Sequence, residues 1–384
     1  MKALSLPAVS IASVFLLGAC STVEKLNPFG SSAPKVQPTE LGVIQPTAEL
    51  KIVWQANVGS AGEFTFSPAV VGDSVYAAGR DGTVARFDGG RQIWRIAAGQ
   101  PISGGVGSDG KLVVVGTPKG EVLAFEAATG RETWKARVSS EVLAAPAVAD
   151  GLAIVRSGDS RIFGFDAVDG KRRWVYQRST PALSLRSNVG VVPAGQFTLA
   201  GFPGGKLVAI ANNNGAAVWE VTVALPKGAT ELERVADVTS LPVVSGSTVC
   251  AAAFQGRVAC FDARSGNTIW SRDMSSSAGL DIDSRYVYVA DDKGAVHALD
   301  AKSGASIWKQ DKLSRRDLSR PLVVGNQVAV ADYQGVVHLL RREDGAFAAR
   351  ANTDGSAVRS EPVHSGAGLL VQTVKGGLYA LESR

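Results

Sequence analysis

The sequence predicts an all-β fold, an eight-bladed β-propeller in which each blade is a four-stranded antiparallel sheet. Three observations predict it. The sequence resembles itself about every forty residues, which is the spacing of a repeat architecture. Each repeat contains short runs of alternating apolar and polar residues separated by glycine-containing turns, and a tryptophan recurs near the end of the repeat. A closed ring absorbs most of the 384 residues in one domain.

The repeats are clearest around their tryptophans. One repeat reads PAVVGDSVYAAGRDGTVARFDGGRQIW and ends at Trp94, and GEVLAFEAATGRETW ends at Trp134. The same position, on the outermost strand of a blade, is occupied elsewhere by Trp54, Trp174, Trp219, Trp270 and Trp308, and we assign Phe347 in EDGAF to the eighth. Trp54 has no earlier strands in its blade, and the chain from Glu361 supplies only three. We therefore expect the N-terminal strand to complete the last blade and close the ring.

Residues 1–19 have the pattern of an export signal. An apolar run follows Lys2 and ends in LLGAC at Cys20. LGAC resembles the lipobox of bacterial lipoproteins, which implies an acylated Cys20, and Ser21 resembles the pattern sorted to the outer membrane. The alternative is an ordinary secretory signal that contains a cysteine. We expect residues 20–48, rich in Pro, Ser and Thr, to be a flexible tether, and residues 49–384 to be the propeller.

Composition argues against nucleic-acid binding and against catalysis. The 40 basic and 35 acidic residues form no long basic run interleaved with aromatics. The consensus G-x-V-x-A-F-D-A-x-T-G-x-x-x-W resembles the repeats of quinoprotein propellers, which implies a periplasmic quinoprotein dehydrogenase as the alternative function. Such an enzyme needs an aromatic cofactor floor, metal-binding carboxylates and usually an adjacent cysteine pair. All seven tryptophans occupy the repeat position, and no two cysteines are adjacent, so we expect no cofactor, no metal and no small-molecule substrate.

Cys250 and Cys260 flank the turn at Gln255-Gly256. Hairpin pairing brings them near each other across two strands. A disulfide in an oxidising compartment and two free buried thiols are both compatible with this arrangement.

Two lengthened connectors form the candidate binding site. Connectors from the outermost strand to the next blade lie on one face of the ring because the strands alternate in direction, and those after Trp174 and Trp219 are the longer ones. The first contains Leu183, Leu185 and Arg186, and the second, ALPKGATELERVADVTSLP, contains Asp237. Leucines beside an arginine and a carboxylate have the composition of an interface anchor. The alternative is internal: the leucines cover the blade edge and Arg186 pairs with Asp237.

The lipobox-like segment, the Pro/Ser tether, the eight-bladed propeller and the phrase TPALSLR together resemble the BamB family of outer-membrane β-barrel assembly lipoproteins. The resemblance implies a non-enzymatic scaffold, anchored in the outer membrane and facing the periplasm, that docks on POTRA domains of the barrel subunit BamA. The family's LSLR and D-x-D docking motifs correspond here to Leu183, Leu185, Arg186 and Asp237, and Thr239 stands in place of the second Asp. A closed ring also predicts a monomer outside the complex.

Two further features of the chain are candidates for binding a partner. The connector KQDKLSRRDLSRP offers Arg315 and Arg316 as additional contacts for an acidic partner surface, with a solvated basic loop as the alternative. Exposed blade edges could instead hold unfolded outer-membrane chains by β-augmentation. We rank this interpretation below docking on BamA.

Overall fold

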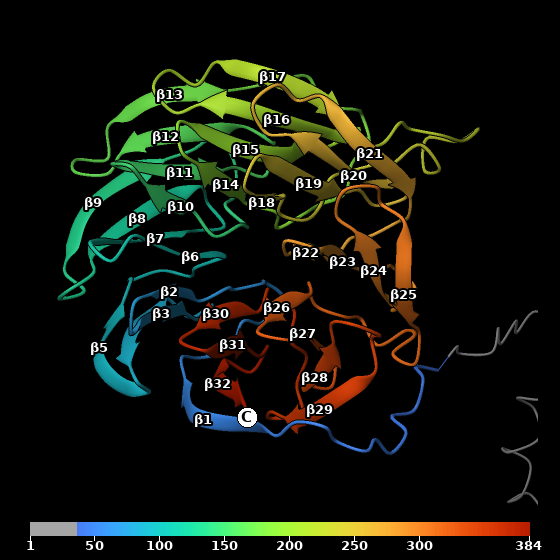
Figure 1. Cartoon of the computed structure of the whole chain (residues 1–384). Coiled ribbons are helices and arrows are strands. Elements are labelled where there is room, and N and C mark those ends of the chain that lie inside the picture. Colours follow the sequence, from blue (N-terminus) through green and yellow to red (C-terminus); the bar gives the residue numbers. More distant parts are fainter. Residues whose placement is uncertain (1–36) are drawn as a thin grey trace, which may run out of the picture. The chain divides into compact units, whose positions relative to one another are not determined.

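The computed structural model describes residues 37–384, and its compact unit, Pro38–Arg384, is a ring of eight four-stranded antiparallel sheets (Figure 1). The predicted all-β class, blade number and blade topology are confirmed. Every regular element in this part of the chain is a strand. Accordingly, residues 37–384 contain no helix with the length and apolarity needed to span a membrane.

Blades 1 to 7 each take four consecutive strands, from the innermost to the outermost. Blades 1 to 4 comprise β2 (Ala69–Val71), β3 (Ser74–Ala78), β4 (Thr83–Asp88) and β5 (Arg91–Ala97); β6 (Gly104–Ser108), β7 (Leu112–Gly116), β8 (Glu121–Glu126) and β9 (Glu132–Arg137); β10 (Ala147–Ala149), β11 (Leu152–Arg156), β12 (Ile162–Asp166) and β13 (Arg172–Tyr176); β14 (Val191–Ala194), β15 (Phe197–Phe202), β16 (Lys206–Ala211) and β17 (Ala217–Thr222). Blades 5 to 7 comprise β18 (Val243–Ser245), β19 (Thr248–Ala252), β20 (Arg257–Asp262) and β21 (Thr268–Asp273); β22 (Gly279–Ile282), β23 (Tyr286–Ala290), β24 (Val296–Asp300) and β25 (Ser306–Gln310); β26 (Leu322–Val324), β27 (Gln327–Ala331), β28 (Val336–Arg341) and β29 (Phe347–Asn352). Blade 8 comprises β30 (Val363–Ser365), β31 (Gly368–Gln372), β32 (Gly377–Ser383) and β1 (Leu50–Asn57).

The N-terminal strand closes the ring, as predicted. The order of blade 8 is β1-β32-β31-β30, so its outermost strand comes from the opposite end of the chain. The antiparallel register runs from Leu50 opposite Ser383 to Asn57 opposite Gly377. In Figure 1 the blue β1 lies beside the red β32, next to the C-terminus. A strand edge that would otherwise be open is therefore paired.

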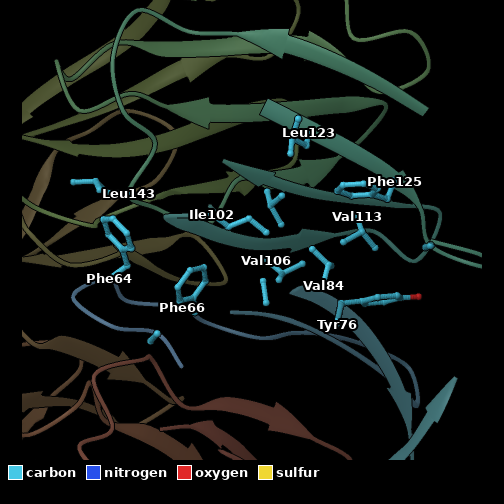
Figure 2. Close-up of a cluster of buried hydrophobic side chains, with 14 residues drawn as sticks. Phe64, Phe66, Tyr76, Val84, Ile102, Val106, Val113, Leu123, Phe125 and Leu143 are labelled. Carbon is cyan, nitrogen blue, oxygen red and sulfur yellow. The ribbon is translucent and has the colours of Figure 1, made fainter. Parts of the chain in front are cut away.

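Neighbouring blades pack through apolar clusters. Figure 2 shows the cluster between blades 1 and 2, where Tyr76 and Val84 face Val113 and Phe125. The middle strands contact a blade on each side and are therefore apolar on both faces; all five residues of β7 are buried. Most outermost strands are largely exposed outside the tryptophan position: in β13 only Trp174 is buried.

In blades 1 to 6 the repeated tryptophan joins the blade to the next one. Trp94 Nε1 donates a hydrogen bond to the carbonyl of Ala127 in the following blade, at 3.0 Å. The Trp94 ring also covers the turn at Gly130, where a Cβ would lie 3.1 Å from the ring and φ is +74°, a backbone conformation that favours glycine. Equivalent indole hydrogen bonds are made by Trp134, Trp174, Trp219, Trp270 and Trp308. The tryptophan repeat is therefore accounted for by blade packing.

The assignment of Phe347 to the eighth tryptophan position was wrong. Trp308 lies opposite Ala298 in its blade, whereas the equivalent position of blade 7, opposite Leu339, is held by Ala349. Phe347 lies two residues earlier, opposite Leu340. Without an indole there, the backbone N–H of Thr47 donates to the carbonyl of Ala348 at 2.9 Å. The N-terminal segment thus lies along the outermost strand of blade 7, which has no tryptophan.

The tether also ends earlier than expected. Residues 38–48 were expected to belong to it, but they lie against blades 6 and 7. The N–H of Thr39 donates to the carbonyl of Ser314 at 3.1 Å, Arg350 Nη1 donates to the carbonyl of Gly42 at 2.7 Å, and Leu41 packs on a buried cluster. These contacts give the segment a fixed path that its Pro- and Thr-rich composition did not reveal. Cys20 and the predicted signal lie outside the described residues.

Candidate docking site

The two lengthened connectors meet in space, as their position on one face of the ring predicts. The Asp237 carboxylate, from the connector between blades 4 and 5, accepts hydrogen bonds from two backbone N–H groups. One is that of Leu185, in the connector between blades 3 and 4, at 2.7 Å. The other is that of Gly204, in the β15–β16 turn, at 3.0 Å. One carboxylate thus holds three segments together.

The expected role of Asp237 as a contact for a partner requires correction. Its side chain is buried, with 2% of the residue exposed, and both of its oxygens already accept hydrogen bonds. Each of those bonds is charge-assisted and therefore stronger than one between neutral groups. Asp237 is a positioning residue that fixes the backbone of residues 183–186, which we call the leucine segment.

Arg186 pairs with Glu141, so the alternative of an internal pair with Asp237 was also wrong. The guanidinium of Arg186 forms a two-point contact, with Nε to Oε1 of Glu141 at 2.9 Å and Nη2 to Oε2 at 2.7 Å. This hydrogen bonding lowers the pKa of Glu141 and raises that of Arg186. The Arg186 side chain remains 63% exposed. It is therefore held in one orientation and still accessible.

Leu183 and Leu185 are exposed. The internal alternative, in which both leucines cover the blade edge, was therefore wrong. Their exposed fractions are 41% and 39%. Sequence reasoning missed two more leucines on the second connector, Leu225 and Leu232, which are 64% and 72% exposed. Both lie within the lengthened stretch and outside any alternating strand pattern, which is the signal that could have identified them. Several exposed leucines on neighbouring connectors are typical of an interaction surface.

The two arginines of the connector before β26 differ in role. Arg315 is exposed and remains a candidate contact. Arg316, expected to meet a partner, is 3% exposed; its Nε donates to Asp332 at 2.7 Å and its Nη1 to the carbonyl of Thr39 at 3.0 Å. It stabilises the docked N-terminal segment, and its candidacy as a contact is withdrawn because no accessible group remains.

The histidines of blades 6 and 7 have structural partners. His297 Nε2 lies 2.8 Å from Asp291, and His338 Nε2 lies 3.1 Å from Asp332. His338 Nδ1 accepts a hydrogen bond from Arg350 Nε at 3.1 Å. Within residues 37–384, no three His, Cys, Asp or Glu side chains are grouped as metal ligands.

Cys250 and Cys260 lie directly opposite each other on β19 and β20. Both are fully buried, and the structure joins them in a disulfide with a Cα–Cα distance of 4.1 Å. Of the two alternatives open from the sequence, the structure contains the disulfide.

Comparisons with known proteins identify the family. Residues 80–310 match a family model described as outer membrane protein assembly factor BamB. The chain is 41% identical, over 387 aligned residues, to the outer membrane protein assembly factor BamB of Burkholderia pseudomallei, covering 100% of this chain and 99% of that relative. It superposes on the crystal structure of BamB from Moraxella catarrhalis with a TM-score of 0.81, at 29% identity and with 87% and 100% of the two chains covered. Quinohemoprotein alcohol dehydrogenase from Comamonas testosteroni has a TM-score of 0.70 at 14% identity, covering 86% of this chain and 76% of that one, and shares the fold alone. The chain, predicted from its repeats to be an eight-bladed propeller, belongs to the BamB family of outer membrane protein assembly factors.

Proposed function

We propose that this protein is a lipid-anchored scaffold that binds POTRA domains of BamA through the connector face of its propeller, and so supports insertion of β-barrel proteins into the outer membrane. The observation that carries the proposal is the exposed pair Leu183 and Leu185, held in place from behind by the buried Asp237. A surface fixed before binding loses less conformational entropy when the complex forms.

The composition of this surface suits a specific, separable complex. Apolar side chains provide area to bury, at about 25 cal/mol per Å². Arg186 provides charged hydrogen-bond donors: its contact with Glu141 uses Nε and Nη2 and orients the guanidinium, and it leaves Nη1 for a partner. Arg and apolar anchors near the centre of an interface contribute a large share of binding energy.

The proposed location of the protein depends on residues outside the described part of the chain. We propose that residues 1–19 direct export, that Cys20 is acylated, and that the chain from Cys20 to Gln37 tethers the propeller. Several acyl chains on one cysteine anchor a protein firmly, whereas one chain binds marginally. A Cys20→Ala variant should be lost from the outer-membrane fraction, and its retention in the outer membrane would contradict the anchor.

The docking proposal is tested by affinity. The full chain, purified in detergent, is titrated with the periplasmic domains of BamA from the same organism. Leu185→Ala combined with Arg186→Ala should weaken binding at least about 30-fold, since loss of a single central anchor such as an arginine often costs 2 kcal/mol or more.

A matched control comes from the outermost strand of blade 3. Val175 is 44% exposed, and Arg173 is exposed and paired with Asp166, so they resemble Leu185 and Arg186 in chemistry but lie on another surface. Val175→Ala combined with Arg173→Ala should bind like the unmodified chain. Equal weakening in both double variants, or none in either, would contradict the proposed surface.

A further inference from the structure

A small cavity lies directly behind the leucine segment. Its volume is ≈ 30 Å³, and it is lined by segments of blades 3 and 4 and of the connectors before, between and after them, among them Arg156, Ser157, Ser184, Leu185, Asp237 and Thr239. A cavity of this size holds two or three small polar atoms. Because Leu185 lines the cavity and is also 39% exposed, the cavity adjoins the proposed docking surface.

Arg156 supplies most of the unused hydrogen-bonding capacity of the cavity. A guanidinium has five N–H groups, and among the described residues the one acceptor it meets is the carbonyl of Gly201, which Nη1 contacts. The guanidinium also lies over the ring of Phe202, 5.1 Å from its centre. Burial lowers the pKa of Arg156 to about 10, although the charge of Asp237 opposes the shift. The group is still cationic at neutral pH and is poorly supplied with acceptors.

The one acidic side chain in the rest of the lining is Asp237. Both oxygens of Asp237 are occupied by backbone N–H groups. Thr239 Oγ1 is buried and has no hydrogen-bond partner among the described residues. A buried polar group without a partner costs free energy. The unused donors of Arg156 and the Thr239 hydroxyl therefore favour an occupant that accepts hydrogen bonds, and the guanidinium favours a carboxylate among such groups.

We propose that this cavity is a socket for a side-chain carboxylate of the docking partner. The inference rests on the proposed function and names the chemistry that the partner brings to the same surface. An Asp or Glu of the partner would enter beside Leu185, meet the free edge of the Arg156 guanidinium and accept a hydrogen bond from the Thr239 hydroxyl. Charge-assisted contact between guanidinium and carboxylate in a desolvated site is among the stronger polar interactions. The socket thus combines a buried charge pair with the adjoining apolar anchor.

The test is a double-mutant cycle between the full chain and the periplasmic domains of BamA. In the full chain, Arg156→Gln removes the cation and Thr239→Val removes the hydroxyl at nearly constant shape. In the partner, each Asp or Glu that faces the complex is changed singly to Asn or Gln. Arg161, on the same blade but outside the cavity lining, provides the control Arg161→Gln.

We expect Arg156→Gln to weaken binding about 30-fold, Thr239→Val to weaken it several-fold, and Arg161→Gln to leave it unchanged. One partner carboxylate should show coupling, so that its substitution costs little once Arg156 is Gln or Thr239 is Val. Hydrogen exchange at the Leu185 amide checks that the leucine segment keeps its position. If Arg156→Gln changes the exchange rate of the Leu185 amide, the double-mutant cycle with Thr239→Val becomes the deciding test of the socket.

Additive costs for every partner carboxylate would overturn the socket, and so would full affinity of the Arg156→Gln variant. Either result would mean that the cavity holds water or a free anion only. Those outcomes leave the docking proposal intact, because Leu185→Ala with Arg186→Ala would still weaken binding. Failure of that double variant to weaken binding would instead refute the docking surface itself.

Discussion

Asp237→Asn should release the leucine segment without removing any exposed side chain. The substitution keeps the shape of the side chain and one acceptor oxygen, but it replaces the second oxygen with an NH₂ group. That group would face a backbone N–H donor, of either Leu185 or Gly204, which now bonds to a carboxylate oxygen at 2.7 or 3.0 Å. One charge-assisted hydrogen bond is lost, and one backbone donor is left unpaired.

The magnitude follows from those two changes. A hydrogen bond to a charged group contributes about 1.5–3 kcal/mol, and an unsatisfied buried donor costs about 1–3 kcal/mol. These figures overlap in part, so the free energy of opening the segment should fall by about 2–4 kcal/mol. That decrease raises the population of the open segment roughly 30- to 700-fold.

Hydrogen exchange measures this effect directly. In Asp237→Asn the Leu185 amide should exchange faster by the factor given above, while amides of fully buried strands such as β7 keep their protection. Binding to BamA should weaken as well, because the leucines lose their fixed position. Asp169→Asn, in an exposed turn where the carboxylate accepts from the Lys171 N–H, should leave Leu185 unaffected. Unchanged exchange at Leu185 in Asp237→Asn would refute the positioning role.

Three further predictions concern the propeller as a whole. Deleting residues 50–57 removes buried Leu50 and the blade-closing Trp54, and should cost about 5 kcal/mol, or roughly 10 °C in Tm; an unchanged melting transition would argue against ring closure by β1. Thiol alkylation of the unfolded chain, followed by mass measurement, should modify Cys250 and Cys260 only after reduction, because the disulfide blocks both sulfurs; modification without reductant would show free thiols. Stability should fall as pH drops below about 6.5, because burial lowers the pKa of His338 despite its bond to Asp332 and the unfolded chain then binds more protons. The slope should stay below about 1.4 kcal/mol per pH unit, which is the limit for one proton, and should flatten in His338→Gln, where an equally steep slope would point to other groups.

The fold was predictable from the sequence because each blade repeats the same local sequence pattern. The turn glycines, the apolar middle strands and the tryptophan all recur at fixed spacing, so an error in one repeat is corrected by the others. The misassigned Phe347 shows the limit of this approach. Counting from the turn glycine would have selected Ala349, since Gly345 precedes it by four residues, as Gly304 precedes Trp308. The assignment gave more weight to the aromatic side chain of Phe347 than to the four-residue spacing from the turn glycine.

The site was predictable in its location but not in the roles of its residues. Connector length identified the place where the repeat is interrupted, and Leu183, Leu185 and Arg186 are indeed accessible there. Composition could not reveal that Asp237 is buried beneath the segment. Neither could it show that Arg316 is enclosed, because that depends on contacts with Thr39, 277 residues away in sequence. Such roles are set by tertiary contacts that no local pattern encodes.

The central claim, that the leucine segment contacts BamA, is tested most directly by site-specific photocrosslinking in the intact cell envelope. A photoreactive residue is placed at position 183, which is 41% exposed and takes part in no cluster of the core. As a control, the same residue is placed at position 175, on the outermost strand of blade 3. The account predicts a crosslinked product with BamA from position 183 and none from position 175. A product with BamA from position 175 alone, or no product with BamA from either position, would contradict it.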